Sequence, residues 1–253
     1  MASIQSSYDN GVQILTISNE AKRNAFTHQM TQELGARLQA AESDAAVKCI
    51  IITGAGDIAF SSGHDLREML DDRDNASDQA ANAPFLMPAT LTTPTIAAIN
   101  GFAFAAGFIL SISCDLRVCA ENASFSAPGA RIGLLPIGGQ LSRLPMLMPR
   151  GIAHEMLISC REMKADEAYR IGFANHLVPR GQALSASLDI AKNIVANSSS
   201  VVASIKTGLE VFAKDGASAA ADYEWEVGRQ LQSAPDADEG MRAFLEKRTP
   251  RFI

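Results

Sequence analysis

Apolar residues in the first 195 positions fall into short runs that alternate with helical patterns. The run VKCIIIT has no polar alternation, which is typical of a strand buried on both faces. Helical spacing predicts an amphipathic helix at residues 27–41 and a second helix that begins near Gly107. The apolar runs predict strands at residues 12–17, 47–53, 95–99 and 116–120. This alternation predicts an α/β fold.

The C-terminal part of the chain has a different pattern. It is wholly helical, with helices expected at residues 201–213, 217–232 and 236–246. We therefore predict an α/β core over residues 1–195 and a helical subdomain over residues 196–253. Residues 71–83 are polar and poor in β-branched side chains, which predicts a mobile insertion.

Composition narrows the class of protein. The 253 residues are 47% hydrophobic, enough for one large core. Lys and Arg number 22 against 28 Asp and Glu, a formal net charge of −6, so nucleic acid is not expected as a partner. The four cysteines lack CxxC spacing, which favours buried, reduced thiols and a cytoplasmic location.

The N-terminus does not resemble a signal peptide, and polar residues and glycines interrupt the apolar stretch at 95–113, so no membrane span is expected.

Two glycine-containing turns form the candidate functional site. The chain has no GxSxG, GxxxxGK[ST] or HExxH motif, and no GxGxxG after a strand. The turns FSSGHDL and NGFAFAAGF each follow a strand-like segment. Their small residues allow a ligand to approach the backbone, and a helix that begins at the second turn leaves N–H groups unpaired. If the turns converge, these groups can form an oxyanion hole that stabilises negative charge on a carbonyl oxygen.

From about Gly11 to Phe252 the sequence resembles the crotonase superfamily, which is the enoyl-CoA hydratase/isomerase family. The resemblance rests on five ordered blocks: IIITGAGDIAFSSGHDLREM, PTIAAINGFAFAAGFILSISCDLRVCAENASFS, GLLP with SRLP, MKADEAYRIGFANHLV and EGMRAFLEKRTPRF. It implies a spiral of ββα units with a C-terminal helical trimerisation region, assembled as a homotrimer or dimer of trimers. It also implies an acyl-CoA thioester as substrate, with coenzyme A as part of that substrate, no separate cofactor and no metal.

The resemblance also assigns site residues. It implies an oxyanion hole made by the backbone N–H groups of His64 and Ala106, beside Gly63 and Gly107 in the two turns. Ala106 departs from the glycine of the family's GGG run, although only its amide is needed. The resemblance assigns contacts with coenzyme A to Arg23, Ala25, Phe244 and Lys247, the last two often from a neighbouring subunit.

The catalytic acids of the family are missing. The positions where hydratases, isomerases and related enzymes carry a carboxylate are occupied by Ile109, Gly129 and Ile137. None of these residues can exchange a proton. The nearest titratable replacement is the imidazole of His64. The exact reaction therefore stays open.

Three alternatives to a typical hydratase stay open. A GHD turn also occurs in crotonase decarboxylases that act on methylmalonyl-CoA, but this chain has Pro136 where those enzymes have a tyrosine. A second alternative is a non-catalytic acyl-CoA binder. The third, RNA binding as in one branch of the superfamily, is disfavoured because Arg37 is the only Lys or Arg in the expected helix at 27–41. Among the other acidic residues, Asp65 is expected to cap a helix, Asp115 to be structural and Glu68 to be solvated.

Overall fold

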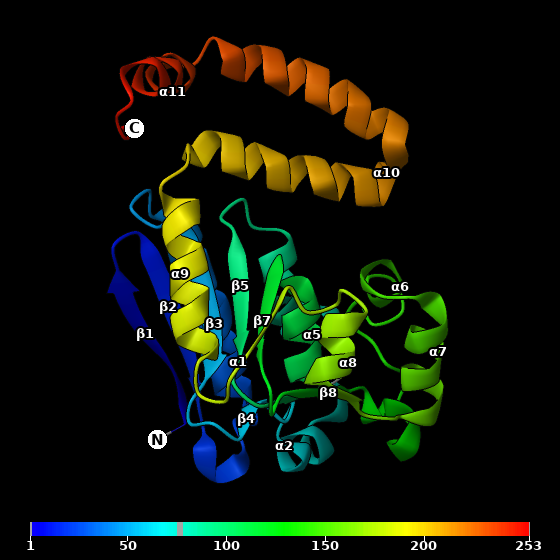
Figure 1. Ribbon diagram of the computed structural model, residues 1–253. Coiled ribbons are helices and arrows are strands. Elements are labelled where there is room, and N and C mark those ends of the chain that lie inside the picture. Colours follow the sequence, from blue (N-terminus) through cyan, green and yellow to red (C-terminus); the bar gives the residue numbers. More distant parts are fainter. Residues whose placement is uncertain (1, 75–77, 253) are drawn as a thin grey trace.

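The computed structural model describes residues 2–74 and 78–252, and two β-sheets lie within them (Figure 1). In the larger sheet β1 is antiparallel to β2, and all other neighbours are parallel. Its strands, in hydrogen-bonded order, are β1 (Ser3–Asp9), β2 (Val12–Ser18), β3 (Cys49–Gly54), β5 (Thr95–Ile99), β7 (Leu116–Ala120) and β10 (His176–Val178). The smaller sheet contains β4 (Ala59–Ser61), β6 (Phe102–Phe104), β8 (Ser124–Ser126) and β9 (Met163–Lys164).

Successive strands alternate between the two sheets. β3 lies in the larger sheet, β4 follows it in the smaller sheet, and α2 (Leu66–Asp71) comes next. β5, β6 and α5 (Ala106–Ser113) repeat this order, and β7 and β8 begin a third unit. The chain is therefore a series of ββα units, and the ends of β4 and β6 deliver the two glycine-containing turns to one region.

The larger sheet is buried on both faces, which explains the absence of polar alternation in its central strands. In β3, Ile50 and Ile52 face a core shared with α1 (His28–Ser43) and α5. Cys49 and Ile51 face a second core that is covered by α9 (Ala183–Val195), and Figure 1 shows α9 lying along this sheet. Both faces of β3 therefore select apolar side chains.

The predicted elements agree closely with the structure, apart from small shifts at their ends. The helix expected at 27–41 begins at His28 because Thr27 is its N-cap, where Thr27 Oγ1 accepts a hydrogen bond from the Met30 amide at 3.2 Å. The break expected between residues 213 and 217 is a kink at Gly216 (φ 86°, ψ 179°) within α10 (Ser199–Gln232). Further α-helices within the described residues include α6 (Leu144–Leu147), α7 (Arg150–Ser159), α8 (Ala165–Arg170) and α11 (Pro235–Glu246).

The two legs of α10 run antiparallel beyond one end of the larger sheet, and α11 follows them (Figure 1). The boundary expected after residue 195 coincides with the end of α9. The division into two domains stays a prediction.

The expectation of a mobile insertion at residues 71–83 is wrong for its last part. Residues 75–77 lie outside the described residues, but α4 (Gln79–Leu86) is a regular helix that packs against α1 and α5. Asp78 caps α4 by accepting a hydrogen bond from the Ala81 amide at 2.7 Å, and Phe85 is fully buried. One buried aromatic ring and a cap outweigh the polar composition here.

Two further expectations concern the core and the membrane. All four cysteines are buried and free, as expected. Burial raises the pKa of the Cys49, Cys114 and Cys119 thiols to about 12, so they are protonated at neutral pH. Among the described residues, no helix combines the length and apolar character that a membrane span requires.

Candidate active site

The first glycine-containing turn joins the end of β4 to α2. Phe26 pairs with His64 as an isolated parallel bridge: the Phe26 amide donates to the Gly63 carbonyl at 2.8 Å, and the Asp65 amide donates to the Phe26 carbonyl at 2.8 Å. Because adjacent residues of an extended chain direct their polar groups to opposite sides, the N–H of His64 points away from Phe26. In the described part of the chain this N–H has no hydrogen-bond acceptor.

The second turn joins β6 to α5. Ala105 precedes the helix with φ 48° and ψ −117°, a backbone conformation that glycine adopts readily and alanine does not. Its amide donates to the Ser126 carbonyl at 3.1 Å, and its carbonyl accepts from the Ile109 amide at 2.9 Å. The N–H of Ala106, at the helix N-terminus, is left without an acceptor among the described residues.

The two turns are in direct contact. A Cβ atom placed on Gly63 would lie 2.7 Å from the Ala105 Cβ and 3.3 Å from the Ala106 amide nitrogen. A Cβ on Gly107 would lie 2.6 Å from the Ser61 carbonyl oxygen. Both glycines are therefore required by close approach, and the structure brings the predicted pair of turns together.

The His64 side chain is held by polar and aromatic neighbours. Its imidazole is hydrogen-bonded to the Asn82 side chain and makes an edge contact with Phe85, with ring centroids 5.0 Å apart. Burial lowers the pKa of this imidazole, the Asn82 hydrogen bond opposes the shift, and nearby His28 adds to it. The ring also lines a cavity of about 50 Å³ whose other walls are His28, Thr31, Gln32, Met69, Ala81 and Asn82. A neutral imidazole is therefore held beside the first turn.

Two of the three positions that lack acids lie near the second turn. Ile109 lies in the first turn of α5 and is only 5% exposed. A Cβ on Gly138 would lie 2.7 Å from the Ile109 side chain, so Ile137 and its neighbour Gly138 pass close to Ile109. Gly129 lies against Leu134, whose amide donates to the Gly129 carbonyl at 2.9 Å. None of the three positions offers a titratable group to this region.

Two of the residues expected to contact coenzyme A lie beside the first turn, and two do not. The Ser62 amide donates to the Arg23 carbonyl at 3.1 Å, which brings Arg23 close to Gly63, and Ala25 directly precedes Phe26, whose amide donates to the Gly63 carbonyl. Phe244 and Lys247 are on and after α11, beyond one end of the larger sheet, whereas α2 and β4 lie at the other end (Figure 1). Within one chain they are separated from the other site residues.

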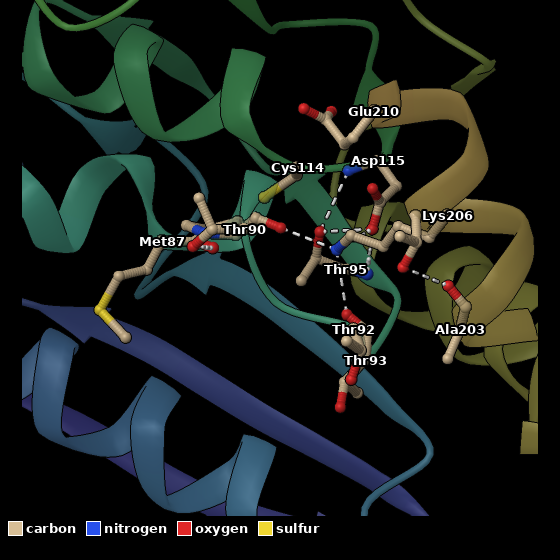
Figure 2. A network of polar contacts seen from close by, with 12 residues as sticks. Met87, Thr90, Thr92, Thr93, Thr95, Cys114, Asp115, Ala203, Lys206 and Glu210 are labelled. Carbon is tan, nitrogen blue, oxygen red and sulfur yellow. Dashed lines mark hydrogen bonds and ion pairs between the residues drawn. The ribbon is translucent and has the colours of Figure 1, made fainter. Parts of the chain in front are cut away.

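Two of the acidic residues have the structural roles that we expected. Asp65 caps α2 by accepting from the Arg67 amide at 3.0 Å, and its ion pair with Lys22 lowers the pKa of its carboxyl group. Asp115 accepts from both the amide and the hydroxyl of Thr95, at 2.7 and 2.8 Å, and pairs with Lys206 (Figure 2).

The expectation that Glu68 is simply solvated is wrong. Its Oε2 accepts a hydrogen bond from the His28 amide at 2.7 Å and lies 3.9 Å from the Nδ1 of His28. This contact ties α2 to the N-terminus of α1, where backbone amides attract a carboxylate.

Sequence reasoning missed Asn82, which lies in the stretch expected to be mobile. It also missed the ion pair between Arg143 and Glu210, which are 67 residues apart. The SRLP block contains Arg143, but no local pattern indicates its partner.

Comparison with known proteins gives the family of this chain. The family model for enoyl-CoA hydratase/isomerase matches residues 7–253. The chain is 33% identical over 242 residues to the carnitinyl-CoA dehydratase of Proteus mirabilis, with 93% of each chain covered. It is 31% identical over 240 residues to the short-chain-enoyl-CoA hydratase of Clostridium acetobutylicum, covering 94% of this chain and 92% of that protein.

Solved structures give the same result. The enoyl-CoA hydratase from Polaromonas sp. JS666 superposes with a TM-score of 0.92 at 30% identity, covering 99% of this chain and 100% of that one. The enoyl-CoA hydratase from Mycobacterium tuberculosis H37Rv gives a TM-score of 0.93 at 28% identity, covering 99% and 98%. These likenesses confirm the crotonase fold that the sequence implied. The chain therefore belongs to the enoyl-CoA hydratase/isomerase family of acyl-CoA enzymes.

Proposed function

We propose that this enzyme holds the carbonyl oxygen of an acyl-CoA thioester between the backbone N–H groups of His64 and Ala106. The observation that carries the proposal is that two turns from different ββα units touch at Gly63 while both amides lack an acceptor among the described residues. Such donors stabilise the charge that develops when the thioester becomes an enolate, and losing one costs about 10²–10³ in kcat.

The proton chemistry differs from that of a typical hydratase. Since Ile109, Gly129 and Ile137 cannot ionise, the imidazole of His64 is the titratable group nearest the proposed hole. Burial lowers its pKa, so it is neutral at pH 7 and able to accept a proton. The names of the curated relatives, a dehydratase and a hydratase, support addition or elimination of water at an enolate as the reaction class.

The resemblance and the structure together suggest how coenzyme A is bound. Arg23 is exposed and supplies a positive charge for a phosphate group, beside the buried Ala25. Phe244 and Lys247 act from a neighbouring copy in a homotrimer or a dimer of trimers. A stripe of exposed apolar residues on α10 supports such an assembly: Val201, Ile205, Leu209 and Phe212. The site uses no metal and no cofactor other than the coenzyme A of the substrate, and the enzyme is cytoplasmic.

Binding and enolate formation are tested separately. A panel of acyl-CoA esters should raise the thermal unfolding midpoint of the protein. Exchange of the α-proton of a saturated acyl-CoA in deuterated water, followed by mass spectrometry, reports directly on enolate formation. The absence of any midpoint shift across the panel would refute the proposal. Binding without exchange would identify a non-catalytic acyl-CoA binder.

The reaction class is tested with crotonyl-CoA. Because the acids are missing, we expect weak hydration, and a turnover number of hundreds per second would contradict our interpretation of these positions. The hydration assay is run with and without bicarbonate. A faster rate with bicarbonate would show that this dissolved base replaces a missing carboxylate.

Decarboxylation of a methylmalonyl-CoA-type substrate is the second candidate. Loss of carbon dioxide leaves its bonding electrons on the α-carbon and so forms the enolate without a base, and a proton from water then converts the enolate to propionyl-CoA. The firmly held imidazole of His64, close to the proposed hole, favours this reaction. Release of carbon dioxide with formation of propionyl-CoA would establish it, whereas proton exchange alone would exclude it.

A further inference from the structure

Residues 129–143, which we call the pocket segment, contact α5 beside the proposed acyl site. Its residue Gly138 packs so closely on Ile109 that an added Cβ would lie 2.7–3.2 Å from three carbons of that side chain. Ile109 is three residues after Ala106 on α5. Where the pocket segment lies therefore determines the space beside the proposed oxyanion hole.

The apolar side chains of the pocket segment contribute little burial. Leu135 and Ile137 are 68% and 42% exposed, so burial holds little of it in place. The Gln140 side chain donates to the Ile137 carbonyl at 2.9 Å, but its Oε1 is buried without a hydrogen-bond partner among the described residues. The Nε of Arg143 is also buried without a hydrogen-bond partner among the described residues. The segment has backbone hydrogen bonds of its own, such as that from the Arg143 amide to the Gly139 carbonyl at 2.7 Å. External contacts add to them, and one joins the Arg131 guanidinium to the Cys160 carbonyl at 3.2 Å.

A strong external contact comes from the C-terminal helical region. The guanidinium of Arg143 binds the carboxylate of Glu210 on α10 through two parallel contacts of 2.8 and 3.2 Å. The two side chains are only 24% and 23% exposed, so water screens this pair less than a surface pair. Two parallel N–H donors fix direction as well as distance.

Glu210 is itself firmly placed. Four residues earlier on α10, Lys206 is buried, and its ammonium group binds the Pro88 carbonyl at 2.7 Å, the Thr93 carbonyl at 3.0 Å and the Asp115 carboxylate at 2.8 Å. Two of these contacts are hydrogen bonds to backbone carbonyls, and the third is an ion pair. Figure 2 shows Lys206 and Glu210 on the same helix, with Asp115 opposite Lys206. The first leg of α10 is thus anchored to the core one turn away from Glu210.

We propose that Glu210 is a positioning residue that fixes the pocket segment through Arg143 and so sets the acyl-chain selectivity of the site. The proposal rests on the proposed function, because it assumes that the acyl group lies beside Ile109. It gives α10 a role in the site of its own chain, in addition to any part in assembly. Glu210 does not touch the substrate.

The test compares Glu210→Gln with a matched control. Arg161 and Glu167 form another two-contact ion pair, at 2.7 and 2.8 Å, with exposures of 26% and 21%. This pair joins residues six apart in the sequence and lies outside the pocket segment. Glu167→Gln therefore removes a two-contact ion pair of similar exposure and breaks no contact made by residues 129–143, while Arg161 keeps its contact with Glu155 at 2.7 Å.

Two measurements are made on each full-length variant. The first is the affinity for free coenzyme A and for saturated acyl-CoA esters of increasing length. We expect Glu210→Gln to weaken ester binding about tenfold and to flatten the dependence on chain length, with affinity for free coenzyme A unchanged. Glu167→Gln should retain the wild-type profile. Arg143→Lys, which keeps the charge but loses the planar fork, should follow Glu210→Gln.

The second measurement is hydrogen exchange of residues 129–143 in the ligand-free protein. It should accelerate in Glu210→Gln and stay at the wild-type rate in Glu167→Gln. This readout does not require a substrate, so it still tests the inference if no ester binds and the proposed function fails. Equal exchange or equal ester profiles in the two variants would overturn the role of Glu210.

Discussion

Replacing Gly63 with alanine tests the contact between the two turns. Gly63 has a φ of 104°, which strains any residue with a side chain. The added Cβ would lie 2.7 Å from the Ala105 Cβ and 3.3 Å from the Ala106 amide nitrogen. Neither neighbour can rotate away, because one is a Cβ and the other is backbone. Relief must therefore move the second turn, including one of the proposed oxyanion donors.

The expected loss of stability has two parts. A strained positive φ costs about 1–3 kcal/mol, and overpacking a close contact costs about 1–3 kcal/mol. Together they should lower the free energy of unfolding by about 4 kcal/mol, which for a chain of this length lowers the melting temperature by about 8–16 °C. If the Ala106 N–H moves out of place, α-proton exchange in saturating acyl-CoA should slow by about 10²–10³.

Gly181→Ala is the matched control. Gly181 has a φ of 80°, and in the described structure nothing lies within 4 Å of the position of an added Cβ. This variant should lose stability through φ strain alone and keep the wild-type exchange rate. Calorimetry and exchange followed by mass spectrometry check both variants. If Gly63→Ala exchanges protons as fast as Gly181→Ala, the reasoning that joins the turns to catalysis is refuted.

Three other predictions concern strain, protonation and assembly. Ala105→Gly should raise the free energy of unfolding by about 1 kcal/mol, measured by denaturant unfolding, because glycine relieves the φ of 48°. Since burial lowers the pKa of His64, the unfolded chain binds more protons than the folded one below about pH 6.5, so stability falls as the pH drops through that range. His64→Gln should flatten this part of a melting curve series between pH 8 and 5, and an unchanged slope would contradict the assignment. Leu209→Asp should reduce the mass of the assembly in light scattering, because a charge is placed on the exposed apolar stripe of α10; an unchanged mass would place the interface elsewhere.

Elements buried in the larger sheet were predictable, and the exposed edge was not. β5 and β7 have the bounds that the sequence predicted, because both faces of a central strand require apolar side chains. β1 was missed because most of its side chains are exposed and polar. The pair Asn10 and Gly11, with φ of 46° and 87°, is the signal of a tight hairpin that could have found it.

The site residues also differ in whether the sequence could predict them. Local glycine patterns indicated the turns at His64 and Ala106, because close backbone approach restricts the residue type at each position. Asn82 and Glu210 contribute through contacts that are distant in the sequence, and polar residues of these types are common on any exposed helix. Only the fold brings Asn82 to the imidazole and Glu210 to Arg143.

The contrast between the proposed oxyanion hole and the non-ionisable residues at Ile109, Gly129 and Ile137 has a physical basis. A backbone N–H keeps its donor whatever side chain the residue carries, so the hole tolerates His64 and Ala106 as long as Gly63 and Gly107 hold the turns together. Proton transfer depends on the side chain itself, and a change to isoleucine or glycine abolishes it. The two parts of the chemistry can therefore change independently. On the proposed function, the two touching turns supply the part that stabilises an enolate. The proton donor or leaving group is then set by what lies beside the proposed hole, where the structure places the imidazole of His64.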